Sequence, residues 1–310
     1  MNLRPLASLS AAFTLALVAC SSSSSGSSVS NDQASDDVAK AICQKYETCA
    51  PLFVQLGYGD EATCETRVKL LVLPSLTANG TGATTSQYET CVGDVSSASC
   101  DDVFSRNLPA SCQTVAGTLA DGMACGVDAQ CKNKLCRIPS GQSCGVCSSV
   151  SVAGGDCVTD SQCDVGLTCI QDKCVPYGAA GASCDNAHPC KPTLACSSGT
   201  CATPGEAGAA CPAAGQGGCD TLKGLFCGTD KVCAAVGTAA PGKACGFVDN
   251  TIVACTSGGR CQTPTDGGTG TCEAAAADGQ ACDDIAGPPC LAPATCANGV
   301  CKISDPTACK

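Results

Sequence analysis

Cysteine spacing is the feature that most constrains the fold of this chain. Of its 310 residues, 33 are cysteine, and the second half repeats a unit of four cysteines. In the two clearest copies, five, five and four residues separate successive cysteines: Cys157, Cys163, Cys169 and Cys174, then Cys184, Cys190, Cys196 and Cys201. A spacing that recurs in this way indicates tandem copies of one small structural unit.

Three looser copies of the unit follow along the chain. Their cysteines are Cys211, Cys219, Cys227 and Cys233; Cys245, Cys255, Cys261 and Cys272; and Cys282, Cys290, Cys296 and Cys301. A module of about 30 residues is too small to be stabilised by an apolar core alone, so disulfides are expected to hold it together. The spacing does not fix the connectivity, because four cysteines permit three pairings.

Glycine and asparagine mark the turns of the unit. A glycine stands three residues before the first cysteine, as at Gly154 and Gly181, where we expect a positive φ. Between the third and fourth cysteines, Asn298-Gly299 is a preferred type I′ pair, and Ser198-Gly199 occupies the equivalent place. The turn residues therefore predict a short β-hairpin in each module.

Residues 36–118 have helical periodicity and predict a small helical domain. Ser35 is expected to cap a first helix, and Asp60 a second helix that ends before Pro74. Six cysteines fall on or beside these helices and would form up to three disulfides: Cys43, Cys49, Cys64, Cys91, Cys100 and Cys112.

The N-terminus predicts export. Residues 1–19 contain Arg4 and then an apolar stretch too short to span a bilayer permanently, as in a signal peptide. The stretch ends in Leu17-Val18-Ala19-Cys20, which resembles the lipobox of bacterial lipoproteins. The resemblance implies cleavage before Cys20, a diacylglycerol on its sulfur, and a location in the bacterial cell envelope, with the outer membrane or cell surface favoured. The alternative is an ordinary secretory signal that contains a cysteine.

The expected fold is small and disulfide-rich, with an α-helical N-terminal domain followed by tandem short β-hairpin modules. Residues 20–35 would be the lipidated Cys20 and a Ser-rich tether. After the helical domain, the expected segments are a short module at 119–153 and repeats at 154–177, 178–204, 205–236, 237–275 and 276–310, the last with a C-terminal tail. Such beads on turn-rich linkers predict an elongated shape that presents surface rather than a deep pocket.

Cysteine parity agrees with export but leaves one question open. Without Cys20 there remain 32 cysteines, an even number, as expected in an oxidising compartment. The segment from Cys125 to Cys147 holds five cysteines, and Cys309 stands alone near the C-terminus. Either these cysteines are joined across modules or one thiol is free.

The repeats resemble the Dickkopf N-terminal-type cysteine-rich repeats of myxobacterial-type surface lipoproteins. The resemblance includes Leu56-Gly57-Tyr58-Gly59 in the helical domain and Gly117-Thr118-Leu119-Ala120-Asp121-Gly122 before the first module. It covers most of residues 36–310. The family has no established activity, so the resemblance implies no catalytic or binding residue.

Residue types used in catalytic or metal sites each have a simpler interpretation here. Cys144 and Cys147 form a Cys-x-x-Cys pair without a βαβ context, and half-cystines explain them. His188 is the only histidine and lies in an expected turn between two half-cystines. Asp128 and Asp160, each three residues before a second cysteine, fit turn or cap residues better than calcium ligands. We predict no catalytic residue, no metal site and no cofactor.

Net charge and aromatic content argue against further classes of function for this chain. A net charge of −11 disfavours nucleic acid as a partner, and 3% aromatic residues without tryptophan disfavour a large barrel or Rossmann enzyme. The leading hypothesis is a non-enzymatic binding, adhesion or envelope-structural role, with the membrane (through the lipid anchor) and an extracellular protein or glycan as partners. One alternative is a protease inhibitor or receptor-like capture module that uses Phe226 or Phe247 as an exposed anchor. Another is a hydrolase in the helical domain.

Overall fold

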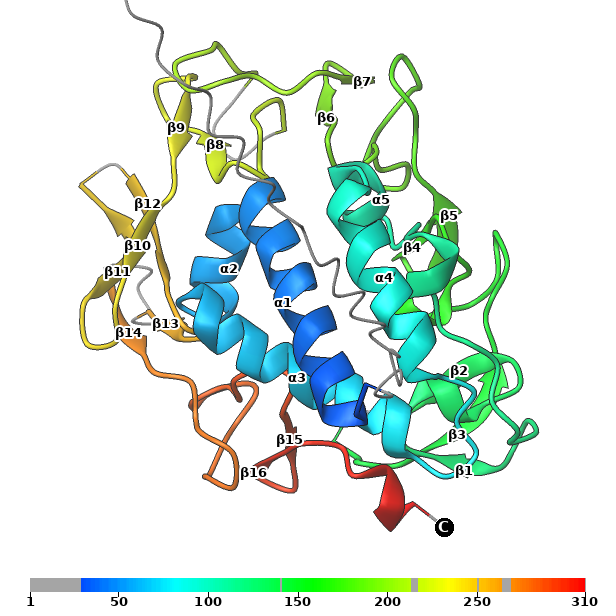
Figure 1. Cartoon of the computed structure of the whole chain (residues 1–310). Coiled ribbons are helices and arrows are strands. Elements are labelled where there is room, and N and C mark those ends of the chain that lie inside the picture. The colour runs from blue at the N-terminus through cyan, green and yellow to red at the C-terminus, as the bar shows by residue number, and fades with distance from the viewer. Residues whose placement is uncertain (1–28, 140, 213–216, 250, 264–268, 310) are drawn as a thin grey trace, which may run out of the picture.

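Disulfides cross-link every part of the described structure internally. The computed structural model describes residues 29–139, 141–212, 217–249, 251–263 and 269–309. An α-helical N-terminal domain, here called the head (residues 31–118), precedes six cysteine-rich hairpin modules, so the predicted fold class is confirmed (Figure 1). The sixteen disulfides among the described residues indicate an extracytoplasmic protein. Cys20 and the predicted signal peptide at 1–19 lie outside the described residues.

Three disulfides join the helices of the head to one another. The helices are α1 (Asn31–Cys49), α2 (Pro51–Gly57), α3 (Glu61–Thr77), α4 (Thr85–Ser97) and α5 (Cys100–Phe104), followed by the short 3-10 helix η1 (Ala110–Cys112). The core packs Ala39 and Val54 against the sulfurs of α1 and α3. The three bridges, which use all six predicted cysteines, are Cys43–Cys64, Cys49–Cys100 and Cys91–Cys112.

The first helix begins earlier than expected. Its N-cap is Ser30, whose hydroxyl accepts the backbone N–H of Gln33 at 3.1 Å, so the expected cap at Ser35 is wrong. Ser35 is buried inside the helix, and its hydroxyl donates to the carbonyl of Asn31 at 2.7 Å. The expected tether therefore ends at least five residues too late, because residues 31–35 are helical.

The third helix has the predicted start but a later end. Asp60 is its N-cap, as expected, and accepts the N–H of Thr63 at 2.7 Å. The helix continues through Pro74 to Thr77, so the expected stop before the proline is wrong. Proline near the end of a helix removes only one hydrogen bond, and the burial of Leu76 and Ala78 holds the final turn against the core.

Each module has the same disulfide pattern, in which the first cysteine pairs with the third and the second with the fourth. In module 2 these bridges are Cys157–Cys169 and Cys163–Cys174. The other pairs are Cys125–Cys136, Cys131–Cys147, Cys184–Cys196, Cys190–Cys201, Cys211–Cys227, Cys219–Cys233, Cys245–Cys261, Cys255–Cys272, Cys282–Cys296 and Cys290–Cys301. Among the described module cysteines, Cys144 of module 1 and Cys309 near the C-terminus stand outside the pattern and pair with each other.

The third and fourth cysteines of a module face each other in an antiparallel hairpin, yet bond to the other two. In module 2, Cys169 of β4 lies opposite Cys174 of β5. The strands are β1 (Ala124–Cys125), β2 (Lys134–Arg137), β3 (Gly145–Ser149), β4 (Leu167–Ile170), β5 (Lys173–Pro176), β6 (Ala195–Ser197), β7 (Thr200–Ala202), β8 (Leu225–Cys227), β9 (Cys233–Ala235), β10 (Gly237–Ala239), β11 (Ala244–Val248), β12 (Thr251–Cys255), β13 (Arg260–Gln262), β14 (Gly270–Glu273), β15 (Thr295–Ala297) and β16 (Val300–Lys302). Further 3-10 helices are η2 (Asp128–Gln130), η3 (Asp160–Gln162) and η4 (Pro306–Ala308).

Turn geometry follows the predicted residues. Asn298 and Gly299 have φ values of 54° and 76°, as a type I′ turn requires, and join β15 to β16. Ser198 makes the same turn with Gly199 between β6 and β7. The opening glycines also have the expected positive φ, 81° at Gly154 for example. These local predictions are confirmed.

Near the start of each module, one residue forms a parallel bridge to the second cysteine; in module 5 this residue is the last of strand β10. The bridges are Leu119 to Cys131, Ser151 to Cys163, Gly178 to Cys190, Gly205 to Cys219, Ala239 to Cys255 and Ala276 to Cys290. We therefore define modules 1 to 6 as residues 119–150, 151–177, 178–204, 205–236, 237–275 and 276–309.

The modules follow one another around the head, so the expected elongated shape is wrong (Figure 1). Modules 1 and 2 are tied to it by Gln130, which donates to the carbonyl of Asn79 at 2.8 Å, and by Arg106, which donates to the carbonyl of Cys163 at 3.2 Å. In module 3, the backbone N–H of Thr193 donates to the carboxylate of Asp101 at 3.0 Å.

The later modules are tied to the head as well. Module 4 approaches α2 so closely that a Cβ added to Gly224 would lie 2.7 Å from a methyl carbon of Leu52. In module 5, the N–H of Ser257 donates to the carbonyl of Gln55 at 3.0 Å. In module 6, the guanidinium of Arg67 pairs with Asp278 at 2.7 Å. Six separate contacts thus bend the string of modules around the helices.

Candidate functional site

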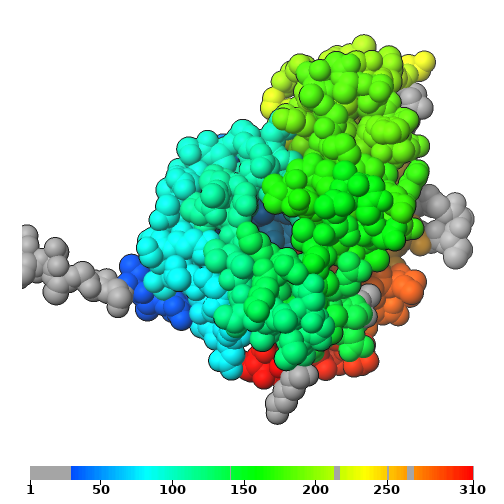
Figure 2. Space-filling model, turned by 90° about the vertical axis from the view of Figure 1, so that its right-hand side faces the viewer, coloured from blue at the N-terminus to red at the C-terminus, as the bar shows by residue number. Residues whose placement is uncertain are grey.

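A cavity of about 1040 Å³ lies where the head meets modules 1, 2 and 6. Figure 2 shows a hollow in the face where the cyan head meets the green modules. The cavity exists because the modules curve around the head. The extended arrangement of modules that the sequence predicted would not form it. Its volume lies at the upper limit of the range of about 300–1,000 Å³ that is typical of ligand sites.

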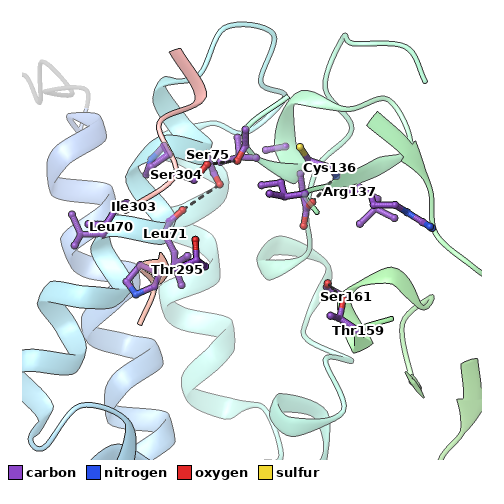
Figure 3. Close-up of a pocket in the computed structure, with 18 of the residues that line it drawn as sticks. Leu70, Leu71, Ser75, Cys136, Arg137, Thr159, Ser161, Thr295, Ile303 and Ser304 are labelled. Carbon is purple, nitrogen blue, oxygen red and sulfur yellow. Dashed lines mark hydrogen bonds between the residues drawn. The ribbon is translucent and has the colours of Figure 1, made fainter. Parts of the chain in front are cut away.

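One wall of the cavity is apolar. It contains Leu70, Leu71 and Pro74 of α3, together with Pro293 and Ile303 of module 6. Leu71 lines this space and is 53% exposed, so its side chain offers apolar surface that the fold leaves uncovered. Figure 3 shows Leu70, Leu71 and Ile303 on the same side of the space.

The opposite wall is polar and comes from modules 1 and 2. Figure 3 shows Arg137, Thr159 and Ser161 on this side, across the space from Leu71. The hydroxyls of Thr159 and Ser161 lie 2.9 Å apart and hydrogen-bond to each other. The Nε atom of Arg137 is buried and has no hydrogen-bond partner among the described residues. A buried donor without a partner costs free energy, so Arg137 is chemically the most unusual group here.

The carboxylates of Asp128 and Asp160 brace their modules internally. Asp128 lines the cavity, and its Oδ1 accepts the backbone N–H of Cys136 at 2.7 Å. Asp160 accepts the N–H of Cys169 at 2.7 Å in the same way. Each links a 3-10 turn to the strand that carries the third cysteine. Burial raises the pKa of Asp128, and the hydrogen bond from Cys136 opposes this shift.

The other residues considered for chemistry are structural or exposed. Cys144 pairs with Cys309 and Cys147 with Cys131, so the Cys-x-x-Cys pair forms no disulfide of its own. The question about Cys309 is thereby answered: it is joined across modules. His188 is exposed, and its Nδ1 lies 2.8 Å from a carboxylate oxygen of Asp185.

Groups of three sulfur atoms recur in the modules, within 4.8 Å of one another. In module 1 they belong to Cys125, Cys131 and Cys147. They arise where the two disulfides of a module pass close together, and a bridged sulfur has no thiolate to offer a metal.

Of the two phenylalanines expected as exposed anchors, Phe247 is exposed and Phe226 is not. Phe226 is half-buried in β8, and Phe247 of β11 is 48% exposed opposite Ile252. Ile285, which the sequence analysis missed, is 91% exposed in the loop between Cys282 and Cys290. Asp283 holds this loop in a turn by accepting the N–H of Ile285 at 2.8 Å.

Sequence reasoning also missed Arg137 and Leu71, and no local spacing marks them. Each lies beside ordinary framework residues, and only the folding of distant segments brings both to one cavity. No family model, curated protein or solved structure matches the chain. Among the helices of the described ranges, none has the length and apolarity needed to cross a bilayer.

Proposed function

We propose that this protein is a lipid-anchored, non-enzymatic binding protein of the bacterial cell envelope, which captures a ligand in the cavity between head and modules. The observation that carries the proposal is the cavity itself, with its exposed Leu71 on one wall and the unpartnered Nε of Arg137 on the other. An apolar space with a few polar groups is the usual form of a ligand site.

The disulfide framework supports capture. Modules 1, 2 and 6 and the head, which together form the cavity, are each cross-linked internally. Walls fixed before binding lose little conformational entropy when a ligand arrives, and this preorganisation raises affinity.

A cavity-filling substitution tests the proposal. Leu71→Trp adds bulk to a side chain that already lines the cavity, and Thr66→Trp is the matched control on an exposed position of α3. We expect native mass spectrometry of protein from its own membranes to show a bound small molecule on the wild type and T66W but not on L71W. Absence of a bound mass from all three, or equal binding by L71W, would contradict ligand capture in this cavity.

The lipid anchor requires a separate test at Cys20. Mass spectrometry of the mature N-terminal peptide is expected to show an acylated Cys20 preceded by no other residue. Cys20→Ser should leave the protein in the soluble fraction or uncleaved. An unmodified Cys20 within a longer mature chain would refute anchoring.

The exposure of Ile285 favours a second candidate function, receptor-like capture of a protein. The loop is rigid, because Asp283 accepts the N–H groups of Ile285 and Ala286, and Arg260 and Gln262 donate to the carbonyls of Asp284 and Ala286. A substrate-like protease inhibitor needs an extended loop with its N–H available, which Ile285 lacks. An Ile285→Glu variant that retained every cell-surface cross-link of the wild type would refute this second function.

A further inference from the structure

We infer that the cavity takes an anionic amphiphile, with its apolar part against α3 and its charged end at Arg137. This inference rests on the proposed function, because it names the ligand class of the same cavity. It follows from the separation of an apolar and a polar wall and from the state of one arginine.

The apolar wall fits a hydrocarbon body. Leu70, Leu71 and Pro74 lie within slightly more than one turn of α3, and Pro293 and Ile303 continue the surface into module 6. Leu71 has no full apolar cover in the structure, as its 53% exposure shows. A hydrocarbon chain laid on this wall would remove apolar surface from water, which is the main favourable term for such a ligand.

Arg137 is the one arginine in the described part of the chain whose side chain has no partner at all, although Arg260 also has one buried nitrogen, Nη1, without a partner. Arg67 binds a carboxylate and two carbonyls, Arg106 binds two carbonyls, and Arg260 binds the carbonyl of Asp284. In contrast, the Arg137 side chain forms no hydrogen bond or ion pair with a described residue, although its Nε is buried. A guanidinium has five N–H donors in a planar fork that matches a carboxylate or phosphate. The Nε itself is covered by protein, but the two Nη groups are not among the buried unpaired atoms and bond to no described residue, so an anion would pair with these two groups.

The surrounding groups direct the charged end toward this wall. Thr159 and Ser161 lie on the same side as Arg137 (Figure 3), and because one hydroxyl donates to the other, one O–H group of the pair is left to donate to an anion. Two carboxylates also line the cavity: Asp128, which is engaged with the N–H of Cys136, and Asp284, which is exposed. Both carboxylates repel an anion. Arg137 is the one cationic side chain among the described lining residues, and the charged end of the ligand is therefore expected beside it.

Photo-crosslinking tests the ligand class. The full lipidated chain, held in nanodiscs of a zwitterionic lipid, is exposed to a diazirine derivative of decanoate and to one of decanol, and labelled peptides are mapped. We expect decanoate to label α3 and the segment containing residues 158–162. We predict that unlabelled decanoate and decyl phosphate reduce labelling by the decanoate probe, whereas decanol and decyltrimethylammonium do not. The stronger of the two anionic competitors distinguishes a free fatty acid from a phosphate-bearing lipid as the source.

Variants of Arg137 test whether labelling by the decanoate probe requires the positive charge of this side chain. Arg137→Gln should lower decanoate labelling about tenfold, because it removes a charge-assisted hydrogen bond, and Arg137→Lys should retain part of it. Lys132→Gln is the control, since it removes one positive charge from an exposed position of module 1 outside the cavity lining. Disulfide mapping and circular dichroism of each variant check that it is folded.

The outcomes separate the two claims. Equal labelling by the decanol and decanoate probes, or unchanged decanoate labelling in a folded R137Q, overturns the inference and leaves ligand capture standing. Preferential competition by decyltrimethylammonium likewise overturns it. If no probe labels the cavity peptides, both the inference and the proposed function fail.

Discussion

Cys144 and Cys309 are 165 positions apart in the chain and are joined by a disulfide, with their Cα atoms 5.4 Å from each other. No other disulfide in the described part spans more than 51 positions. Beside this closing disulfide, the hydroxyl of Ser304 lies 3.0 Å from the carbonyls of Gly126 and Ser143. The C-terminal tail is thereby fixed to module 1, and the course of modules around the head is closed.

Removing the Cys144–Cys309 disulfide should destabilise the protein without unfolding the modules. For Cys144→Ser/Cys309→Ser we expect the free energy of unfolding to fall by about 2–4 kcal/mol in guanidinium denaturation, because a long chain loop regains freedom in the unfolded state. Hydrogen exchange should rise around Ile303 and Ser304. Cys184→Ser/Cys196→Ser, which removes a bridge within module 3, is the control and should leave exchange there unchanged. Equal hydrogen-exchange rates around Ile303 and Ser304 in the two variants would show that the Cys144–Cys309 disulfide does not hold the C-terminal tail in place.

The closing disulfide should also be the first to be reduced. Neither Cys144 nor Cys309 is buried, whereas every other described disulfide has at least one buried cysteine. Thiol–disulfide exchange requires access to a sulfur atom, so mild dithiothreitol without denaturant should open this bridge first. Alkylation at short times followed by peptide mass mapping measures the order. Early labelling of another pair would refute the prediction.

Arg67 should be the most sensitive contact between the head and module 6. Its side chain is only 10% exposed, pairs with Asp278, and donates to the carbonyls of Leu291 and Ala292 at 2.6 and 2.7 Å. Arg67→Met should lower the free energy of unfolding by about 3 kcal/mol, because two carbonyls and a carboxylate lose their donor. Asp278→Asn should cost less, since Asp278 is 39% exposed and its interaction is screened by solvent. Equal losses would show that the carbonyl contacts contribute little.

Asp128 should give the stability of module 1 a measurable pH dependence. Burial raises its pKa in the folded protein above the ordinary value of 3.8, so the folded state binds the proton more tightly than the unfolded chain. This contribution is complete below pH 3.8 and is lost as the pH rises through the folded pKa. Asp128→Asn stays neutral and can still accept the Cys136 N–H. Its stability relative to the wild type should therefore increase with pH over this window, as denaturation at several pH values would show. If the free energies of unfolding of the wild type and D128N changed with pH in the same way, Asp128 would not be the source of this pH dependence.

Local chemistry was the part of the fold that the sequence predicted well. The pair Asn298-Gly299 specifies its hairpin because its φ values suit few other residues, and the cap at Asp60 needs only the N–H of Thr63 nearby. Ser30 and Ser35 show the limit of such reasoning. Both are competent caps, and the choice between them depends on burial of Ser35 against the folded head.

Long-range relationships were not predictable from spacing. The pairing of first with third cysteine is one of three arrangements allowed in each module. The contact of Arg67 with Asp278 joins residues 211 positions apart, and neither residue has a sequence pattern that marks its partner. The cavity depends on several such contacts at once, which is why Leu71 and Arg137 could not be identified before the modules were placed around the head.

In open solenoids an extra repeat merely lengthens the array, so the number of copies drifts easily between related proteins. Here the tail must return to Cys144, and each module must meet its own partner in the head. Inserting or deleting one copy would leave Cys309 unable to reach that partner. The circumference of the head therefore sets the copy number at six, and lineages of this architecture are expected to vary in loop length rather than in how many modules they carry.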